Sequence, residues 1–166
     1  MRRFLGSLRP GGPSAADDAW AVAALTPAEV ALWRRMSTAD RRHGVDVARR
    51  ADASLGARAT RPVVAAALLH DVGKIDSALG PFRRAAATVL ALVRGRGVVV
   101  AATRHRDGAL GRIGRYLRHD EIGAGLLAAA GSDALTVAWA GEHHLPPERW
   151  TLPPEVAAAL KAADDD

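Results

Sequence analysis

Six histidines and the aspartates near them are the residues of this chain whose types and spacing could do chemistry. The histidines are His43, His70, His105, His119, His143 and His144. His70 is followed by Asp71 in the run Leu69-His70-Asp71-Val72-Gly73-Lys74. A His-Asp pair alone arises often by chance. His-Asp-x-Gly-Lys at the end of an apolar helix is more specific, because the glycine permits a sharp helix exit and the lysine then lies beside the pair.

This pattern favours a metal site. Neutral imidazole and ionised carboxylate suit a divalent transition metal, and the chain has no cysteine that could supply a thiolate. A carboxylate has two oxygens, so Asp71 can bridge two ions. The other candidate ligands lie on different predicted elements, from which side chains can converge on the core of a helical bundle.

Each histidine also has an ordinary interpretation. Taken alone, His43 and His119 are more simply packed or surface residues, and His143-His144 could be a solvated helix end, where cationic imidazole suits the helix dipole. His105 lies in Arg104-His105-Arg106-Asp107, which is typical of a charged loop, and we do not assign it to a site. The ordered set, rather than any one histidine, favours the metal site.

The elements that must position these residues are helices. Thr26-Pro27-Ala28-Glu29 is a capping box with proline at the first helical position, so a helix should run from there to about Met36. Further helices are expected at about 38–55, 63–71, 81–93, 110–117, 121–130, 133–142 and 155–163. Val98-Val99-Val100 is strand-like but has no partner strand, so we expect a loop or a helix start there. The prediction is one all-α domain of about seven or eight helices over residues 15–166, preceded by a loose N-terminal tail, residues 1–14.

Composition limits the functions that are open to the chain. Its 166 residues, 49% of them apolar, suit one domain with a core, and no run of about 20 apolar residues is present to span a membrane. The absence of cysteine excludes disulfides and cysteine nucleophiles. We therefore expect a cytoplasmic protein with no membrane partner, of open oligomeric state. The net charge is +5 and 21 of the 23 cations are arginine, which fits either GC-rich coding or a surface that attracts anions such as nucleotides or nucleic acid.

Five segments, taken in order, carry a more specific pattern. They are Arg42-His43-Gly44-Val45-Asp46-Val47-Ala48, Leu68-Leu69-His70-Asp71-Val72-Gly73-Lys74, Arg118-His119-Asp120-Glu121-Ile122-Gly123-Ala124, Ala140-Gly141-Glu142-His143-His144 and Ala162-Ala163-Asp164. This set resembles the HD superfamily of metal-dependent phosphohydrolases, over about residues 26–164. The third and fourth segments are similar to the branch with an enlarged ligand set, which includes HD-GYP proteins and the HD domains of membrane-bound cyclic-di-AMP phosphodiesterases.

The resemblance implies an HD-type helical bundle with a dinuclear site. It assigns one ion to His43, His70, Asp71 and Asp164, and the other to Asp71, His119 and His143. Whether His143 or its neighbour His144 is the ligand stays open, as does the choice among Asp164, Asp165 and Asp166. The resemblance implies two divalent metal ions, with transition metals preferred. Fe and Mn are the first choices, and Co or Mg could also be accommodated.

The activity that the resemblance implies is hydrolysis of a nucleotide-type phosphoester, such as a cyclic dinucleotide, by a metal-activated hydroxide. Asp71, Lys74 and His144 would be the catalytic residues; Lys74 would contact a phosphate, and His144 would touch the substrate or protonate the leaving oxygen. The Gly-Tyr-Pro signature of HD-GYP proteins is absent after the paired histidines, where Leu145-Pro146-Pro147 follows, so we do not assign specificity for cyclic di-GMP.

Two other classes compete with the phosphohydrolase. An HD-type di-iron oxygenase uses a similar ligand set, and redox activity of bound iron would distinguish it. A non-catalytic basic module would bind nucleic acid through its arginines or act in signalling, without need of metal. Nucleic-acid binding is not favoured, because the chain has only seven aromatic residues and no recognised reader motif.

Overall fold

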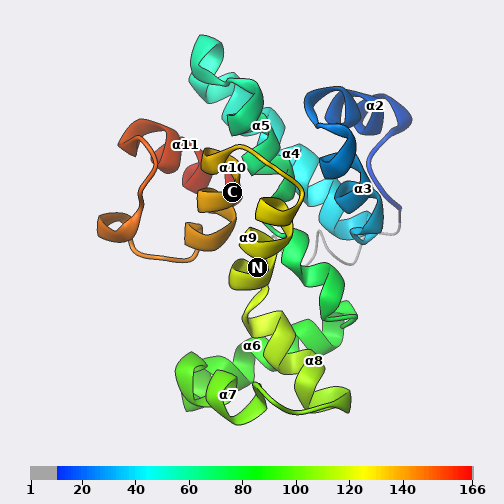
Figure 1. Ribbon diagram of the computed structural model, residues 1–166, viewed down its shortest axis with the longest axis vertical. Coiled ribbons are helices and arrows are strands. Elements are labelled where there is room, and N and C mark those ends of the chain that lie inside the picture. Colours follow the sequence, from blue (N-terminus) through cyan, green and yellow to red (C-terminus); the bar gives the residue numbers. More distant parts are fainter. Residues whose placement is uncertain (1–10, 166) are drawn as a thin grey trace.

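All regular structure in the computed structural model, which describes residues 11–165, is helical (Figure 1). The α-helices are α2 (Ala15–Ala24), α3 (Pro27–Arg35), α4 (Thr38–Leu55), α5 (Arg61–Leu69), α6 (Pro81–Arg94), α7 (Arg96–Thr103), α8 (Gly108–Leu117), α9 (His119–Ala129), α10 (Ala134–Glu142) and α11 (Pro154–Asp165). Three 3-10 helices accompany them, η1 (Gly56–Arg58), η2 (Val72–Asp76) and η3 (Pro147–Arg149). The all-α prediction is confirmed, with ten α-helices in the described range where seven or eight were expected. Residues 1–10 of the expected N-terminal tail lie outside that range.

Capping residues that the sequence marks set the early helix boundaries. The N–H of Glu29 donates to the Thr26 hydroxyl and the N–H of Thr26 donates to the Glu29 carboxylate, which completes the predicted capping box of α3. Ser37 caps α4 by accepting from the N–H of Asp40. Gly56 ends that helix with a φ of +55°, a conformation that favours glycine.

α2 and α7 are the two α-helices for which no range was predicted from the sequence, although a helix start was one of the two expectations at Val98 to Val100. α2 begins after Ser14, whose hydroxyl accepts from the N–H of Asp17. α7 contains the run from Val98 to Val100, whose β-branched side chains favour strands. The run is helical because α7 packs against α6 and α8 with Val99 buried, so tertiary contacts override the local preference.

The core is built around α5. Every residue from Val63 to Leu69 is buried, and this helix packs against α2, α4 and α10. α4 approaches it closely at Gly44, where a Cβ would lie 2.6 Å from the carbonyl oxygen of Leu68. A helix that is apolar on all sides belongs in the interior, so the residues that follow its C-terminal end are delivered inside the protein.

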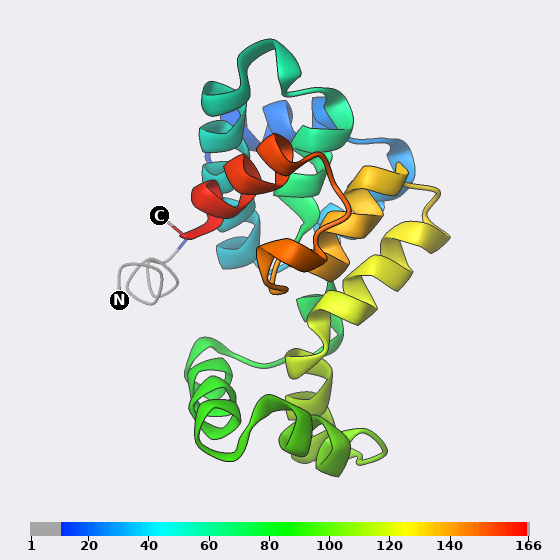
Figure 2. The same cartoon turned by 90° about the vertical axis from the view of Figure 1, so that its left-hand side faces the viewer.

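Helices α6, α7 and α8 form a lobe beside this core, and we call residues 81–117 the α6–α8 lobe (Figure 2). The three helices pack mainly on one another, and α8 also contacts η2. The chain enters the lobe after η2 and returns to the core at α9. The lobe is thus inserted between the segment of His70 and Asp71 and the segment that begins with His119.

No single helix between residues 11 and 165 is long and apolar enough to cross a membrane. α6 and α7 together meet that test of length and composition, but they are bent by 115° at the break between them.

Gly73→Ala should lower the free energy of unfolding by about 1–3 kcal/mol or more, as overpacking does. A Cβ at this position would lie 1.9 Å from the carbonyl oxygen of His119 and 2.6 Å from the backbone nitrogen of Gly123, and backbone atoms cannot swing away. Denaturant unfolding followed by circular dichroism measures the change. Gly125→Ala on α9 is the matched control: its Cβ meets no described atom within 4 Å, and helix propensity predicts a gain of up to about 1 kcal/mol. Equal effects of the two variants would contradict the close packing of η2 on α9.

Candidate metal centre

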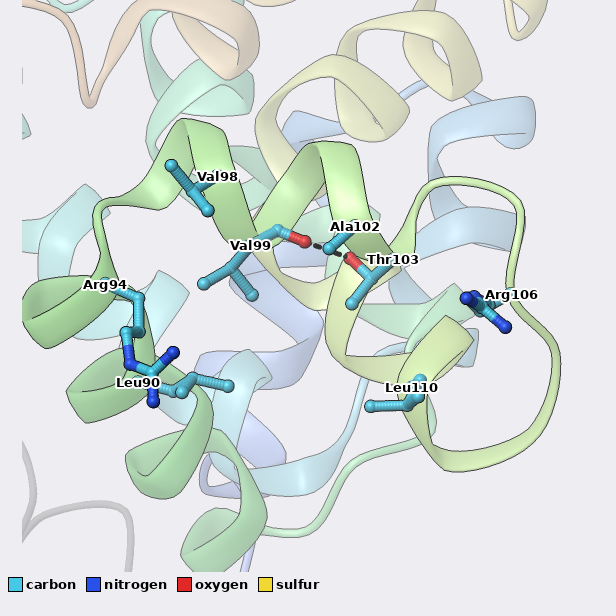
Figure 3. Close-up of a pocket in the computed structure, with 8 residues that line it drawn as sticks. All are labelled: Leu90, Arg94, Val98, Val99, Ala102, Thr103, Arg106 and Leu110. Carbon is cyan, nitrogen blue, oxygen red and sulfur yellow. Dashed lines mark hydrogen bonds between the residues drawn. The ribbon is translucent and has the colours of Figure 1, made fainter.

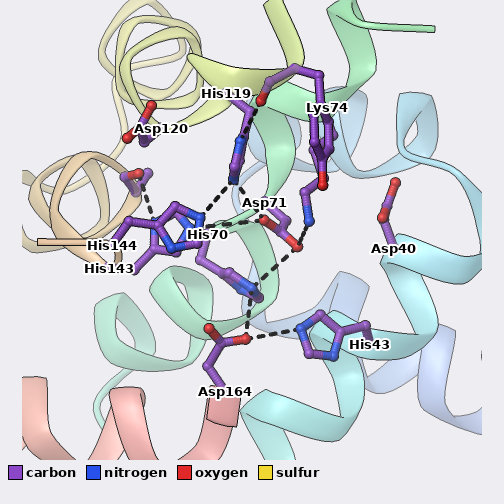
Figure 4. Close-up of polar contacts among 12 residues, drawn as sticks. Asp40, His43, His70, Asp71, Lys74, His119, Asp120, His143, His144 and Asp164 are labelled. Carbon is purple, nitrogen blue, oxygen red and sulfur yellow. Dashed lines mark hydrogen bonds and ion pairs between the residues drawn. The ribbon is translucent and has the colours of Figure 1, made fainter. Parts of the chain in front are cut away.

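The predicted site residues come from distant segments and lie in one cluster (Figure 4). His43 comes from α4, His70 and Asp71 from the end of α5, Lys74 from η2, His119 from the start of α9, His143 and His144 from the end of α10, and Asp164 from α11. The ring centroid of His70 lies 5.3 Å from that of His43 and 5.2 Å from that of His143. The unassigned His105 lies in the exposed turn after α7.

The end of α5 turns two adjacent side chains into the cluster. Neighbouring side chains of a regular helix point about 100° apart. α5 ends at Leu69, and Asp71 has a φ of −96° and a ψ of 7° where the chain passes into η2. His70 and Asp71 are both buried, with exposed fractions of 1% and 3%. His70 keeps helical angles (φ −53°, ψ −33°), so the chain leaves helical geometry only at Asp71, after both side chains have been directed into the cluster.

Three histidines are oriented by the same backbone contact. Nδ1 of His70, His119 and His143 lies 2.9, 2.7 and 3.0 Å, respectively, from the carbonyl oxygen three residues earlier. A carbonyl only accepts, so each Nδ1 carries the hydrogen and the bond fixes the ring, as is common for metal-binding histidines. Within residues 11–165, the buried Nε2 atoms of His70 and His143 have no hydrogen-bond partner. Nε2 of His70 lies 3.5 Å from Oδ2 of Asp71 and 3.4 Å from Oδ1 of Asp164, so its nearest polar neighbours are carboxylates, and this arrangement is compatible with a metal site.

The donor atoms form two groups, each able to hold an ion. One group is His43, His70 and Asp71 and the other is His119, His143 and His144, with the donor atoms in each group within 4.8 Å of one another. Asp71 faces both groups. Its Oδ2 lies 3.5 Å from Nε2 of His70, and its Oδ1 lies 3.3 Å from Nε2 of His119 and 3.9 Å from Nε2 of His143. Each oxygen of Asp71 is thus directed to a different group, as a bridging carboxylate requires.

Asp164 contributes the second buried carboxylate. Its Oδ1 lies 3.0 Å from Nε2 of His43 and 3.4 Å from Nε2 of His70, and the residue is 2% exposed. Asp165 is exposed and pairs with Lys161, and Asp166 lies outside the described residues. Of the two C-terminal aspartates that the structure describes, Asp164 is the one that lies in the cluster.

The charge of these carboxylates is balanced by a proton and an ammonium group. Burial raises the pKa of Asp71, but Lys74 and His70 hold that pKa well below its usual range. Burial lowers the pKa of His70, but the carboxylates of Asp71 and Asp164 outweigh it and raise the pKa to about 10. Lys74 pairs with Asp71, and the carboxylates of Asp71 and Asp40 raise the pKa of its ammonium group against the effect of burial. Loss of the proton from His70 would leave Asp71 with its cationic partner Lys74 and would free the imidazole to bind a metal ion.

The paired histidines at the end of α10 have the opposite character. Burial and the neighbouring rings of His70 and His144 hold the pKa of His143 well below its usual range. Partial burial and the ring of His119 lower the pKa of His144 to about 4. Nε2 of His144 lies 3.1 Å from Nε2 of His119, so one of these nitrogens donates to the other. Both rings of the pair are neutral at pH 7, the form in which imidazole binds a metal.

Three residues that border the site were not identified from the sequence. Arg84 donates to both oxygens of Asp40, at 2.6 and 2.9 Å, and so joins the α6–α8 lobe to α4. The ring of Tyr116 stacks on His119, with centroids 5.7 Å apart. Tyr116 is the only tyrosine and lies three residues before His119, which was a weak signal. Asp40 and Arg84 are 44 residues apart in the sequence, and no sequence signal indicated that they would pair.

No protein-family model, no curated protein and no solved structure matches this chain. The function is therefore inferred from the residues and their geometry.

Metal binding should release about one proton per chain near pH 8. With a pKa of about 10, the metal-free His70 carries a proton on Nε2 there and must lose it to become a ligand. The apparent affinity should therefore fall as the pH is lowered. Calorimetric titration with Mn²⁺ in two buffers of different ionisation enthalpy counts the protons, and His105→Gln, a change in the exposed turn, is the control that should behave as wild type. Identical heats in the two buffers would contradict a protonated His70.

Proposed function

We propose that this protein is a metal-dependent phosphohydrolase of the HD type, which hydrolyses a nucleotide-type phosphoester at a dinuclear centre. The observation that carries the proposal is the position of Asp71, whose two oxygens face two separate histidine groups. In two-metal phosphoesterases the ions lie about 3.5–4 Å apart and act on one phosphoryl group. A carboxylate between the two groups suits that separation.

The ligand set that we propose is the one that the resemblance to the HD superfamily implies. His43, His70, Asp71 and Asp164 would hold one ion, and Asp71, His119 and His143 the other, with His144 as the alternative to His143. The ions that we propose for this set of imidazoles and carboxylates are Fe or Mn, with Co or Mg also accommodated. When bound, two such ions lower the pKa of a water and offset the negative charge of phosphoryl oxygens.

Lys74 would bind the substrate. Its side chain is 16% exposed and its ammonium group is paired with Asp71, so a positive charge lies at the edge of the cluster. Asp71 and Asp40 keep this group protonated. An ammonium group in this place can attract a non-bridging phosphoryl oxygen, and this cation is the feature that favours phosphoester hydrolysis over the oxygen chemistry of a di-iron oxygenase.

His144 would act at the exposed side of the site. The residue is exposed, whereas His143 is fully buried. A ring with a pKa of about 4 is neutral at pH 7, so His144 would donate an N–H hydrogen bond to the substrate. It would protonate the leaving oxygen only after the negative charge of a bound phosphate had raised its pKa.

Asp71→Asn should remove both metal ions and lower phosphodiester hydrolysis by more than about a hundredfold, since changes that merely touch a ligand's partner already cost 10–100-fold. Metal content per chain and turnover of bis(p-nitrophenyl) phosphate and of cyclic dinucleotides measure the two effects. Asp165→Asn, at an exposed carboxylate, is the matched control. Full metal occupancy in the Asp71 variant would exclude the bridging role. Turnover that requires dioxygen would replace the proposal with the oxygenase.

Lys74→Gln should leave metal content unchanged and lower kcat/KM by about tenfold to a hundredfold, the worth of one charge-assisted hydrogen bond. The chain has one other lysine, Lys161, which is paired with Asp165 at the surface, so Lys161→Gln is a control with the same chemical change. Steady-state kinetics on the metal-loaded protein give the answer. Equal kinetics for the two variants would place Lys74 outside the substrate site.

A further inference from the structure

The exposed apolar side chains of this protein are gathered in one region. Every large hydrophobic side chain that is exposed in residues 11–165 belongs to the α6–α8 lobe: Phe82, Val89, Leu90, Leu92, Val93, Val98 and Leu110. Leu92 is 80% exposed, Val93 73% and Phe82 71%. On α6 the spacing of Phe82, Val89 and Val93 places them on one helical face. Exposed apolar side chains that are gathered in one region are typical of an interaction site.

The same region is strongly basic. Residues 81–118 contain nine arginines and a single acidic residue, Asp107. Some of the arginines are used within the fold, such as Arg84 with Asp40 and Arg96 with Asp120. Four others, Arg83, Arg94, Arg106 and Arg112, are exposed and form no ion pair with any residue of the described range 11–165. The lobe therefore presents uncompensated positive charge beside exposed apolar groups.

A hollow of 330 Å³ lies within this surface. Figure 3 shows Leu90, Val98, Val99 and Leu110 around it, with Arg94 on one side and Arg106 on the other. Apolar walls flanked by guanidinium groups match a molecule that has a hydrocarbon part and an anionic head.

We propose that the α6–α8 lobe docks on the surface of an anionic lipid bilayer. A basic surface with large aliphatic side chains and a phenylalanine is what binds at a membrane interface, where apolar groups enter the acyl boundary and cations meet lipid phosphates. A second copy of this chain is disfavoured as the occupant because two such faces repel each other. Nucleic acid would satisfy the arginines but leave the exposed aliphatic groups in water. From the sequence we expected no membrane partner; a helical lobe that lies on the membrane surface replaces that expectation.

Sedimentation of the full chain with lipid vesicles tests the inference. We expect the protein to pellet with vesicles of equal parts phosphatidylglycerol and phosphatidylcholine, to pellet far less with phosphatidylcholine alone, and to be released by salt. Arg94→Gln/Arg106→Gln should weaken binding about thirtyfold, because each arginine near an anionic leaflet contributes about 1 kcal/mol. Leu92→Gln/Val93→Gln should weaken it about tenfold or more through lost apolar burial.

The matched control is Arg34→Gln/Arg149→Gln, which makes the same charge change at exposed arginines on α3 and η3. All these side chains are exposed, and circular dichroism should show unchanged helix content. Failure of the wild type to pellet with anionic vesicles would overturn the proposal, as would an equal loss in the control variant. A wild-type dimer in sedimentation equilibrium that Leu92→Gln/Val93→Gln converts to monomer would also overturn it, because the face would then be an interface between copies. The proposal does not depend on catalytic activity, and loss of vesicle binding is separate from loss of metal.

Discussion

The buried carboxylate of Asp71 is the constraint around which this fold is arranged. A charge that is 3% exposed is costly unless it is paired, and here the partners come from the end of α5, from η2, from α9 and from α10. Each of these elements supplies one side chain that pairs with Asp71. The packing of α5 against α4 and α10 brings them within reach of one another, so the hydrophobic core and the polar centre are parts of one arrangement.

The orientation of the imidazoles depends on a property of helix ends. The last carbonyls of an α-helix have no partner within the helix. In α5, α8 and α10 one such carbonyl accepts the Nδ1 hydrogen of the histidine three residues later, which satisfies the carbonyl and fixes the ring together. The rings of His70, His119 and His143 are therefore placed by backbone geometry, and no ligand is needed to orient them.

Local sequence signals were enough to predict most of the helices. They did not predict which helices contact one another in the fold. The capping box at Thr26 and the serine cap at Ser37 act over a few residues, so the sequence alone was enough to place α3 and α4. The candidate site residues were predicted from the order of short motifs, and the fold brings them together. The Asp40–Arg84 pair, the helical state of Val98 to Val100 and the exposed apolar groups depend on contacts made across the folded chain, which local patterns do not encode.

The α6–α8 lobe is inserted in the chain between two segments of the candidate centre. One connection leaves the core a few residues after Lys74, and the other returns at His119, so both anchor points of the lobe are parts of the candidate centre. Arg115 donates to the carbonyl of Asp76 and ties the two connections together. Arg84 adds a third attachment, to Asp40 on α4, the helix that also carries His43. The lobe and the candidate centre thus share their attachment points in this fold.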